Sequence, residues 1–150
     1  MKIIIVGGVA GGMSAATRLR RLMEDAEIII FEKGPFVSFA NCGLPYYVSG
    51  EIANRDSLLV QTPESLKARF NLDVRPFHEV IQISPEEHTV TVRHDGQEFT
   101  ENYNKLILSP GAKPFVPVIE GLAEAKNTYT LRNVPDLDEI MAALDKHPKE

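Results

Sequence analysis

The stretch KIIIVGGVAGGMSAATRLR, residues 2–20, decides the fold. It begins with a β-branched run typical of a buried strand, passes through a glycine-rich turn at 7–12 and continues with helical spacing. A strand, a glycine turn and a helix in this order predict the opening of a βαβ nucleotide-binding unit. Glycine lets the backbone bend tightly and approach a pyrophosphate, which the free N–H groups at the helix start attract.

The glycine turn departs from the G-x-G-x-x-G pattern at one position. Gly7 and Gly12 fit the first and last glycines, but Val9 stands where the middle glycine belongs. Gly8 and Gly11 flank it and are candidates for the close approach instead.

A second buried strand, residues 26–31, ends at Glu32. This acid lies twenty residues after Gly12, where a carboxylate accepts hydrogen bonds from a ribose. A surface glutamate at a strand end is the plainer reading. The consecutive strand, turn, helix, strand and acid favour the ribose role.

Composition limits the function classes. The chain has 150 residues, 43% of them hydrophobic and 25% charged, which suits one globular domain or a piece of one. With a net charge of −5 and no basic run, nucleic acid is not an expected partner. Neither a signal peptide nor a membrane-length apolar run is visible. The single cysteine excludes an internal disulfide and fits the reducing cytoplasm. The histidines, which share no metal-site spacing and are read as solvated or structural, are His78, His88, His94 and His147.

The remaining pattern predicts an α/β fold. Apolar runs predict parallel strands at 2–6, 27–31, 72–75 and 105–108, and alternating residues with turns at 85–87 and 95–96 predict an antiparallel meander at 79–103. Helices are expected at 10–24, 63–71 and 135–146, and a short strand at 127–131.

The stretch SFANCGLPYY, residues 38–47, surrounds the cysteine. Ser38 is a good helix N-cap, and a short helix to about residue 48 is expected. A helix start nearer Asn41 or Cys42 would place Pro45 in its first turns and the Cys42 thiol near its N-terminus. Helix-start N–H groups stabilise a thiolate, the form that attacks a disulfide or persulfide sulfur. An isolated cysteine is more often an inert buried thiol, but the loop-forming neighbours of Cys42 favour use.

Three arginines cluster in the far half of the first helix, at Arg18, Arg20 and Arg21. Cations there complement the helix dipole, so a solvated face explains them. A site for an anionic ligand explains them equally well, and both interpretations stay open from the spacing alone.

Four stretches, 7–16, 31–33, 38–47 and 108–114, resemble the flavin-binding part of the single-cysteine flavoprotein disulfide reductases. The chain is most similar to coenzyme A-disulfide reductases and NADH-dependent persulfide reductases, along essentially its whole length. The resemblance implies a Rossmann-like FAD-binding domain with a parallel sheet and a three-stranded antiparallel meander. It also implies a homodimeric parent enzyme that uses FAD and NAD(P)H, with no metal and no membrane partner.

The resemblance implies roles for particular residues. Cys42 would be the redox thiol, cycling between a thiolate and a mixed disulfide or persulfide. FAD would contact Gly7, Gly8, Val9, Ala10, Gly11, Gly12, Phe31, Glu32, Lys33, Asn41, Cys42, Val80, Ser109, Pro110 and Gly111. Coenzyme A would contact Ser14, Arg18, Arg21, Ser38 and Asn41, since guanidinium groups pair bidentately with phosphates.

Two departures bear on the reaction. Related NADH oxidases and peroxidases have a histidine where Ala10 stands, and its absence disfavours oxygen or peroxide chemistry. The Cys-x-x-x-x-Cys pair of glutathione-reductase-type enzymes is also missing. An NADH oxidase or peroxidase-like flavoprotein, an NAD(P)-dependent dehydrogenase half and a non-catalytic nucleotide-binding module are the alternatives. CoA disulfide, CoA persulfide and polysulfide are all allowed substrates.

Such enzymes also need an NAD(P)H-binding domain and a dimerisation domain. Residues 1–150 are therefore expected to be the N-terminal portion of an FAD-binding domain, with those two domains outside this chain. The chain alone is not expected to consume NADH steadily.

Overall fold

The computed structural model describes residues 1–146, which form two compact units. The first unit comprises residues 1–39 and 59–111, and the second comprises residues 40–58 together with the described residues from 112 onward. Within residues 1–146, no helix combines the length and apolar character needed to cross a bilayer. In the same range, no three His, Cys, Asp or Glu side chains gather as metal ligands. His147 lies outside the described residues.

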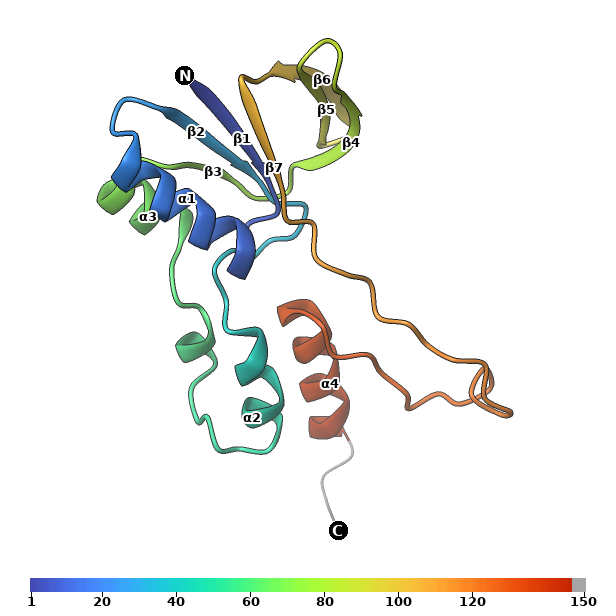
Figure 1. The fold of residues 1–150 in the computed structure, drawn as a ribbon. Helices are drawn as coiled ribbons and strands as arrows, with labels where there is room; N and C mark the ends of the chain where they lie inside the picture. Colours follow the sequence, from blue (N-terminus) through green and yellow to red (C-terminus); the bar gives the residue numbers. More distant parts are fainter. Residues whose placement is uncertain (147–150) are drawn as a thin grey trace. The chain divides into compact units, whose positions relative to one another are not determined.

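A four-stranded parallel sheet forms the centre of the first unit (Figure 1). Its strand order is β3-β2-β1-β7. β1 is therefore an inner strand, with β2 on one side and β7 on the other. Ile4 of β1 lies opposite Ile29 of β2 on one side and Leu106 of β7 on the other. The parallel sheet expected from the sequence is confirmed, with bounds β1 (Lys2–Val6), β2 (Glu27–Phe31), β3 (Asp73–Arg75) and β7 (Lys105–Leu108).

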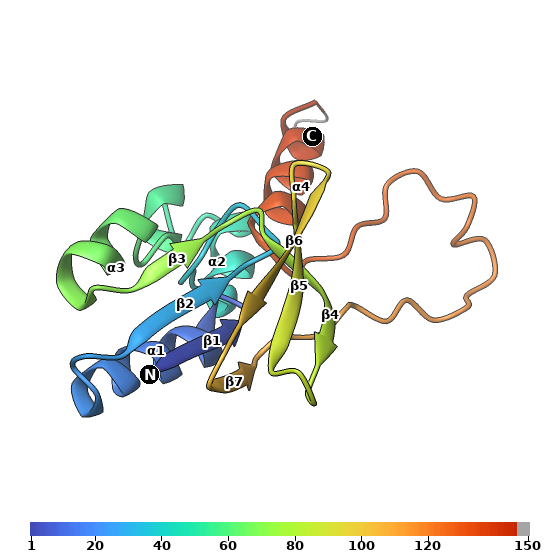
Figure 2. The ribbon, with the colours of Figure 1, turned by 90° about the horizontal axis from the view of Figure 1, so that it is seen from above.

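The two faces of this sheet bury alternate isoleucines. Ile3 and Ile5 pack with residues of helices α1 (Ala10–Leu22) and α3 (Pro63–Phe70). Ile4 packs with Val90 and Val92 of the meander on the opposite side (Figures 1 and 2). A strand alternates its side chains between faces, so cover on both faces explains why the run is apolar throughout.

The meander is a three-stranded antiparallel sheet of β4 (Glu79–Ser84), β5 (Thr89–His94) and β6 (Gln97–Asn102), as predicted. Asp95 and Gly96 form the second turn with φ of 49° and 76°, which suits a two-residue hairpin. Glu101 of β6 forms ion pairs with Lys2 and Arg75, so charged contacts join the two sheets.

The second unit is helical. It contains the short 3-10 turns η1 (Asn41–Gly43) and η2 (Arg55–Leu58) and the helices α2 (Leu44–Val48) and α4 (Val134–Lys146). Arg55 holds Asp138 of α4 with two hydrogen bonds of 2.7 Å, and this contact raises the pKa of the guanidinium. A bidentate pair therefore joins the two sequence segments of this unit.

Three expectations were wrong. Ser38 is not a helix cap: its φ is +48°, its N–H donates to the Gly8 carbonyl at 2.8 Å, and the helical turn begins at Asn41. Residues 127–131 form no strand, because no described strand offers them a backbone partner. The first helix ends at Leu22 rather than at residue 24. The Met23 N–H closes the last turn by donating to the Leu19 carbonyl.

Candidate dinucleotide and thiol sites

Gly7 begins the glycine turn at the carboxyl end of β1. Its φ is +99°, and its N–H donates to the Phe31 carbonyl at 2.8 Å. A Cβ at this position would lie 2.0 Å from the Ser109 carbonyl oxygen, which follows β7. Both the backbone conformation and the contact with Ser109 require glycine here.

Gly12 closes the turn from the other side. A Cβ on Gly12 would lie 1.8 Å from the Gly7 carbonyl oxygen, so α1 can rest on the turn only without a side chain there. The N-cap Val9 supplies no side-chain acceptor, and the first N–H groups of a helix have no partner within it. These donors face the carboxyl edge of the sheet and form a suitable anion site.

Of the two candidates for the close approach, Gly8 is buried and Gly11 is exposed. A Cβ on Gly8 would lie 3.0 Å from both Glu32 Cβ and Val37 Cγ1. On Gly11, the nearest atom would be the Ser109 side-chain oxygen at 3.3 Å. Gly8 therefore serves packing within the protein, whereas Gly11 keeps the outer side of the turn open.

Glu32 joins the end of β2 to the glycine turn. Its Oε2 accepts the Gly8 N–H at 2.7 Å, and its Oε1 accepts the Gly34 N–H at 2.8 Å. The carboxylate is thus held at the carboxyl edge of the sheet, where the sequence placed a ribose acceptor. Each oxygen keeps a further lone pair for a ligand hydroxyl.

The other predicted FAD contacts in the first unit differ in their access. Lys33, Pro110 and Gly111 are exposed, and Gly111 has a φ of +72°. Phe31 is 1% exposed as a whole residue and its carbonyl accepts the Gly7 N–H, so little of it is accessible to a ligand. Val80 lies in the meander, packed against the core cluster that contains Ile4 and Phe31, and not in the glycine turn.

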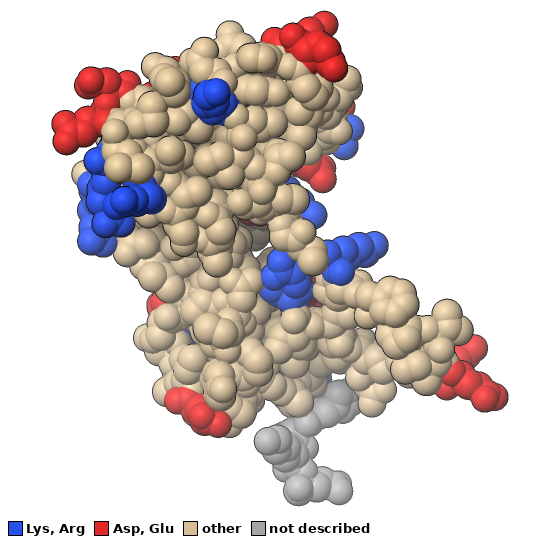
Figure 3. Space-filling model, viewed as in Figure 1, with Lys and Arg blue, Asp and Glu red and all other residues tan. Residues whose placement is uncertain are grey.

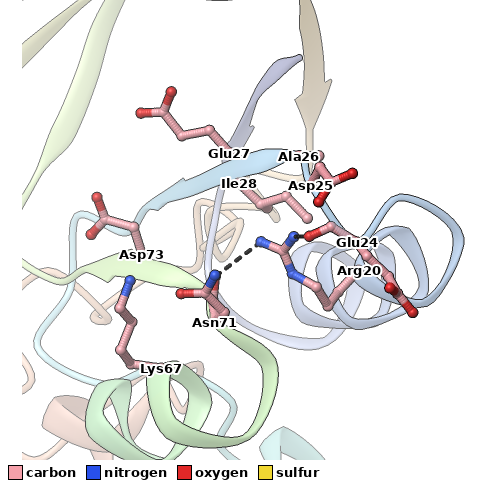
Figure 4. Close-up of a pocket in the computed structure, with 9 residues that line it drawn as sticks. All are labelled: Arg20, Glu24, Asp25, Ala26, Glu27, Ile28, Lys67, Asn71 and Asp73. Atoms are coloured by element: carbon pink, nitrogen blue, oxygen red, sulfur yellow. Dashed lines mark hydrogen bonds between the residues drawn. The ribbon is translucent and has the colours of Figure 1, made fainter.

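Arg20 differs from the other two arginines of the cluster in its contacts. Arg20 donates to the Phe70 carbonyl at 2.9 Å and to the Asn71 carbonyl at 3.0 Å, which ties α1 to the end of α3. Figure 4 shows the bond to Asn71. Arg18 and Arg21 are exposed and share one helical face with exposed Ser14, by their i, i+4 and i+7 spacing. Arg20 is therefore engaged within the protein and is neither a solvated side chain nor a candidate phosphate ligand. The exposed Arg18 and Arg21 fit both a solvated helix face and a site for an anionic ligand. Basic side chains gather over α1 and α3 in the space-filling view (Figure 3).

A pocket of about 480 Å³ lies near Arg20, at the amino ends of β2 and β3 (Figure 4). The glycine turn lies at the opposite, carboxyl ends of the strands, where ligands of open α/β sheets bind. Charged side chains of both signs line the pocket, among them Glu27, Lys67 and Asp73. It is not the dinucleotide site.

Cys42 lies in the second unit, in the 3-10 turn that leads into α2. Its thiol is free and exposed, as expected, and Pro45 occupies the first turn of α2. Behind it, Gly43 is buried, and a Cβ there would lie 2.7 Å from the Leu58 side chain. Asn41 is half-buried next to the thiol in the chain. The thiol is therefore carried by a well-packed surface turn and is not part of an apolar core.

Sequence reasoning missed a pair of stacked histidines, His78 and His94. Their ring centroids are 3.9 Å apart and their planes differ by 8°. The hairpin register was the signal that could have found them, since Glu79 pairs with Arg93 and residues 78 and 94 come next on the two strands.

The fold and the glycine turn define a dinucleotide-binding α/β protein. The family model "Pyridine nucleotide-disulphide oxidoreductase" matches residues 1–147, and the chain belongs to this family of oxidoreductases.

Named relatives narrow the comparison. The chain is 44% identical over 149 residues to coenzyme A disulfide reductase of Staphylococcus haemolyticus, covering 97% of this chain and 33% of that protein. It resembles the structure of reduced CoADR-RHD of Bacillus anthracis, with 56% identity and a TM-score of 0.92 over 97% of this chain and 26% of the other. The NAD-dependent persulfide reductase of A. fulgidus gives 34% identity and a TM-score of 0.92, over 98% and 28% of the two chains. The chain thus spans about a third of the length of the curated relative.

Proposed function

We propose that this chain is the N-terminal part of the FAD-binding domain of an NAD(P)H-dependent flavoprotein that reduces CoA disulfide or CoA persulfide. The single observation that carries this proposal is the joined arrangement of Gly7, Gly12, Glu32 and Ser109 at one edge of the parallel sheet. The cited relatives, a CoA disulfide reductase and a persulfide reductase, support the substrate class.

The first unit supplies the binding surface that we assign to FAD. The helix-start N–H groups of α1 would hold the pyrophosphate, and Glu32 would accept hydrogen bonds from the adenosine ribose. Gly111, exposed after β7, would bring backbone close to the cofactor. Bound FAD would supply two-electron transfer from NAD(P)H to the mixed disulfide that Cys42 forms with the substrate.

Cys42 would carry the sulfur chemistry. Its thiolate attacks one sulfur of CoA disulfide, the S–S bond breaks, and one CoA leaves as a thiolate that takes a proton. The product is a mixed disulfide between Cys42 and the second CoA. A further two electrons and a proton, derived from NAD(P)H, cleave that disulfide, release the second CoA thiol and restore the Cys42 thiolate. CoA persulfide gives the same mixed disulfide with hydrosulfide as the leaving group.

Exposed Ser14, Arg18 and Arg21 suit the phosphates of coenzyme A, because guanidinium groups bind phosphate bidentately. Ser38 and Asn41 are proposed further contacts. Ala10 occupies the place where an oxidase or peroxidase would use an imidazole, which favours disulfide over oxygen chemistry.

The remaining parts of the proposal concern the whole protein. An NAD(P)H-binding domain and a dimerisation domain would lie outside residues 1–150, and the enzyme would act as a cytoplasmic homodimer. An exposed single thiol supports a reducing compartment. Sedimentation of the full protein tests the dimer.

Replacement of the thiol tests the function. In the protein that carries this chain, Cys42→Ser should abolish NADH oxidation with CoA disulfide or CoA persulfide as acceptor while FAD stays bound. Serine keeps the size of cysteine but is a far poorer nucleophile at neutral pH. Ser49→Ala, which removes an exposed hydroxyl after α2, is the matched control and should keep full activity. Near-wild-type activity in Cys42→Ser would overturn the mechanism, and loss of flavin together with activity would indicate a structural role for the residue.

A further inference from the structure

The loop Pro76-Phe77-His78, between β3 and β4, donates backbone hydrogen bonds to residues 32–34, which we call the Glu32 corner. The His78 N–H donates to the Glu32 carbonyl at 2.9 Å, and the Phe77 N–H donates to the Gly34 carbonyl at 3.2 Å. Glu32 in turn binds the Gly8 N–H of the glycine turn. A chain of hydrogen bonds therefore connects this loop to the proposed FAD pyrophosphate site.

Phe77 is an unusual residue at the centre of this loop. Its φ is +59°, a conformation that bulky residues avoid, and its side chain is 57% exposed. Its own side chain therefore contributes little packing to hold the loop. The loop depends on its hydrogen bonds, including one from the neighbouring hairpin.

That hydrogen bond comes from His94, whose Nδ1 lies 3.0 Å from the Phe77 carbonyl oxygen. The Nδ1 of His78 lies 2.8 Å from the Pro76 carbonyl oxygen. A carbonyl oxygen only accepts, so each Nδ1 carries the proton and donates. Each Nε2 is then the ring atom that remains able to accept a second proton.

Proton uptake by both rings would place two positive charges face to face at 3.9 Å. Asp95 lies 3.3 Å from the His94 Nε2 and can balance one of these charges. The other neighbours of the pair offer no second free carboxylate. The neighbouring Phe31 and Phe99 rings are neutral, and Arg75 lies over the Phe31 ring. Arg93 forms ion pairs with Glu98 and Glu79. The Glu32 carboxylate accepts the N–H groups of Gly8 and Gly34.

We propose that His78 and His94 are positioning residues that make FAD binding sensitive to acid, an inference that rests on the proposed function. At neutral pH the stacked pair holds the loop 76–78 and, through it, Glu32 and the glycine turn. When both rings are charged they separate, the hydrogen bond to the Phe77 carbonyl is lost, and the Glu32 corner loosens.

The test measures FAD affinity as a function of pH, by recovery of flavin fluorescence, in the full protein. Between pH 7.5 and 5.5 the dissociation constant should rise by up to about fivefold, the effect of the repulsion between two like charges at this separation in water when all of it reaches the FAD site. His94→Asn keeps a donor near the Nδ1 position but cannot become charged, and it should flatten this rise. His88→Asn is the matched control, because His88, in the turn between β4 and β5, stacks on Tyr103. It should follow the wild-type profile.

Nuclear magnetic resonance titration of the imidazole signals provides a second readout, which shows whether both rings take up protons over the pH range in which FAD is lost. A flat wild-type affinity profile, or an unchanged rise in His94→Asn, would refute the acid-sensitive pair. Failure of the wild-type protein to bind FAD at any pH would instead refute the proposed function. Circular dichroism across the range separates loss of flavin from unfolding.

Discussion

The Glu32 carboxylate accepts the backbone N–H of Gly8 at 2.7 Å and so connects the end of the second strand to the turn after the first. Its other oxygen accepts the Gly34 N–H at 2.8 Å. An acid that the sequence marked as a ligand-binding group is therefore also a brace for the glycine turn. An amide in its place keeps one acceptor oxygen but cannot accept both N–H groups, so it should affect both roles.

Glu32→Gln should weaken FAD binding and also lower the free energy of unfolding. One of the two N–H groups loses its acceptor, at a cost of about 1–3 kcal/mol. Flavin fluorescence titration and urea unfolding measure the two effects. Glu87→Gln, at an exposed meander turn, is the control and should change neither. If unfolding were unaffected while FAD binding fell, the brace would be unimportant.

Gly12→Ala should destabilise the first unit, because its new Cβ would lie 1.8 Å from the Gly7 carbonyl oxygen. We expect a loss of about 1–3 kcal/mol, typical of overpacking, as measured by denaturant unfolding. Gly11→Ala is the matched control one residue earlier, where the nearest atom is a side-chain oxygen at 3.3 Å. Equal stability of the two variants would contradict the tight contact between α1 and the turn.

Arg18→Gln and Arg21→Gln should each raise the KM for CoA disulfide by about tenfold, the equivalent of one charged hydrogen bond, with kcat unchanged. Arg20→Gln should instead lower the unfolding temperature, because Arg20 caps the carbonyls of Phe70 and Asn71. Steady-state kinetics and a thermal melt distinguish the two classes. A KM effect confined to Arg20→Gln would reverse this assignment.

Thr62 caps α3: its side-chain oxygen accepts the Ser65 N–H at 3.2 Å, and the Ser65 hydroxyl oxygen accepts the Thr62 N–H. A hydrogen bond from the Thr62 side chain lowers the pKa of Glu64 below the ordinary 4.5, and a backbone hydrogen bond is the second cause. A carboxyl with a lowered pKa stabilises the fold above its unfolded-state pKa, and this stabilisation disappears as pH falls through its folded-state pKa.

Thr62→Val should therefore cost about 1 kcal/mol of unfolding free energy at neutral pH, the usual effect of a lost N-cap. The difference from wild type should shrink as pH falls through the lowered folded-state pKa of Glu64, since below it Glu64 is protonated in both proteins. Urea unfolding at several pH values measures it. A constant difference across this range would show that Glu64 does not contribute.

The parallel sheet and the meander were predictable because their residues repeat with different periods. Ile3 to Ile5 are apolar in succession and are covered on both faces, whereas Val90 and Val92 alternate with exposed or half-exposed neighbours. These periods report burial, which the sequence carries directly. Residues 127–131 have strand-like composition but lack a neighbour to pair with, and no local pattern reports a missing partner.

The candidate site was predictable in its residue types and less so in its contacts. Glycine and an acid at the right spacing located the turn and Glu32. The backbone N–H groups that Glu32 holds, and the left-handed φ of Ser38 in place of a helix cap, depend on how separate segments meet. The same is true of His94 and Phe77, which are seventeen residues apart.

The central position of the first strand also has a consequence for synthesis of the chain. β1 emerges from the ribosome before β7, yet one of its edges pairs with β7, whose residues 105–108 come about a hundred residues later. At about 5–20 residues per second, that edge would wait on the order of 5–20 s for its partner. During this interval an apolar strand with unpaired N–H and C=O groups is open to other nascent chains. We therefore expect ribosome-bound chains that stop before residue 105 to bind holdase chaperones, and chains that display residues 105–108 outside the exit tunnel to release them.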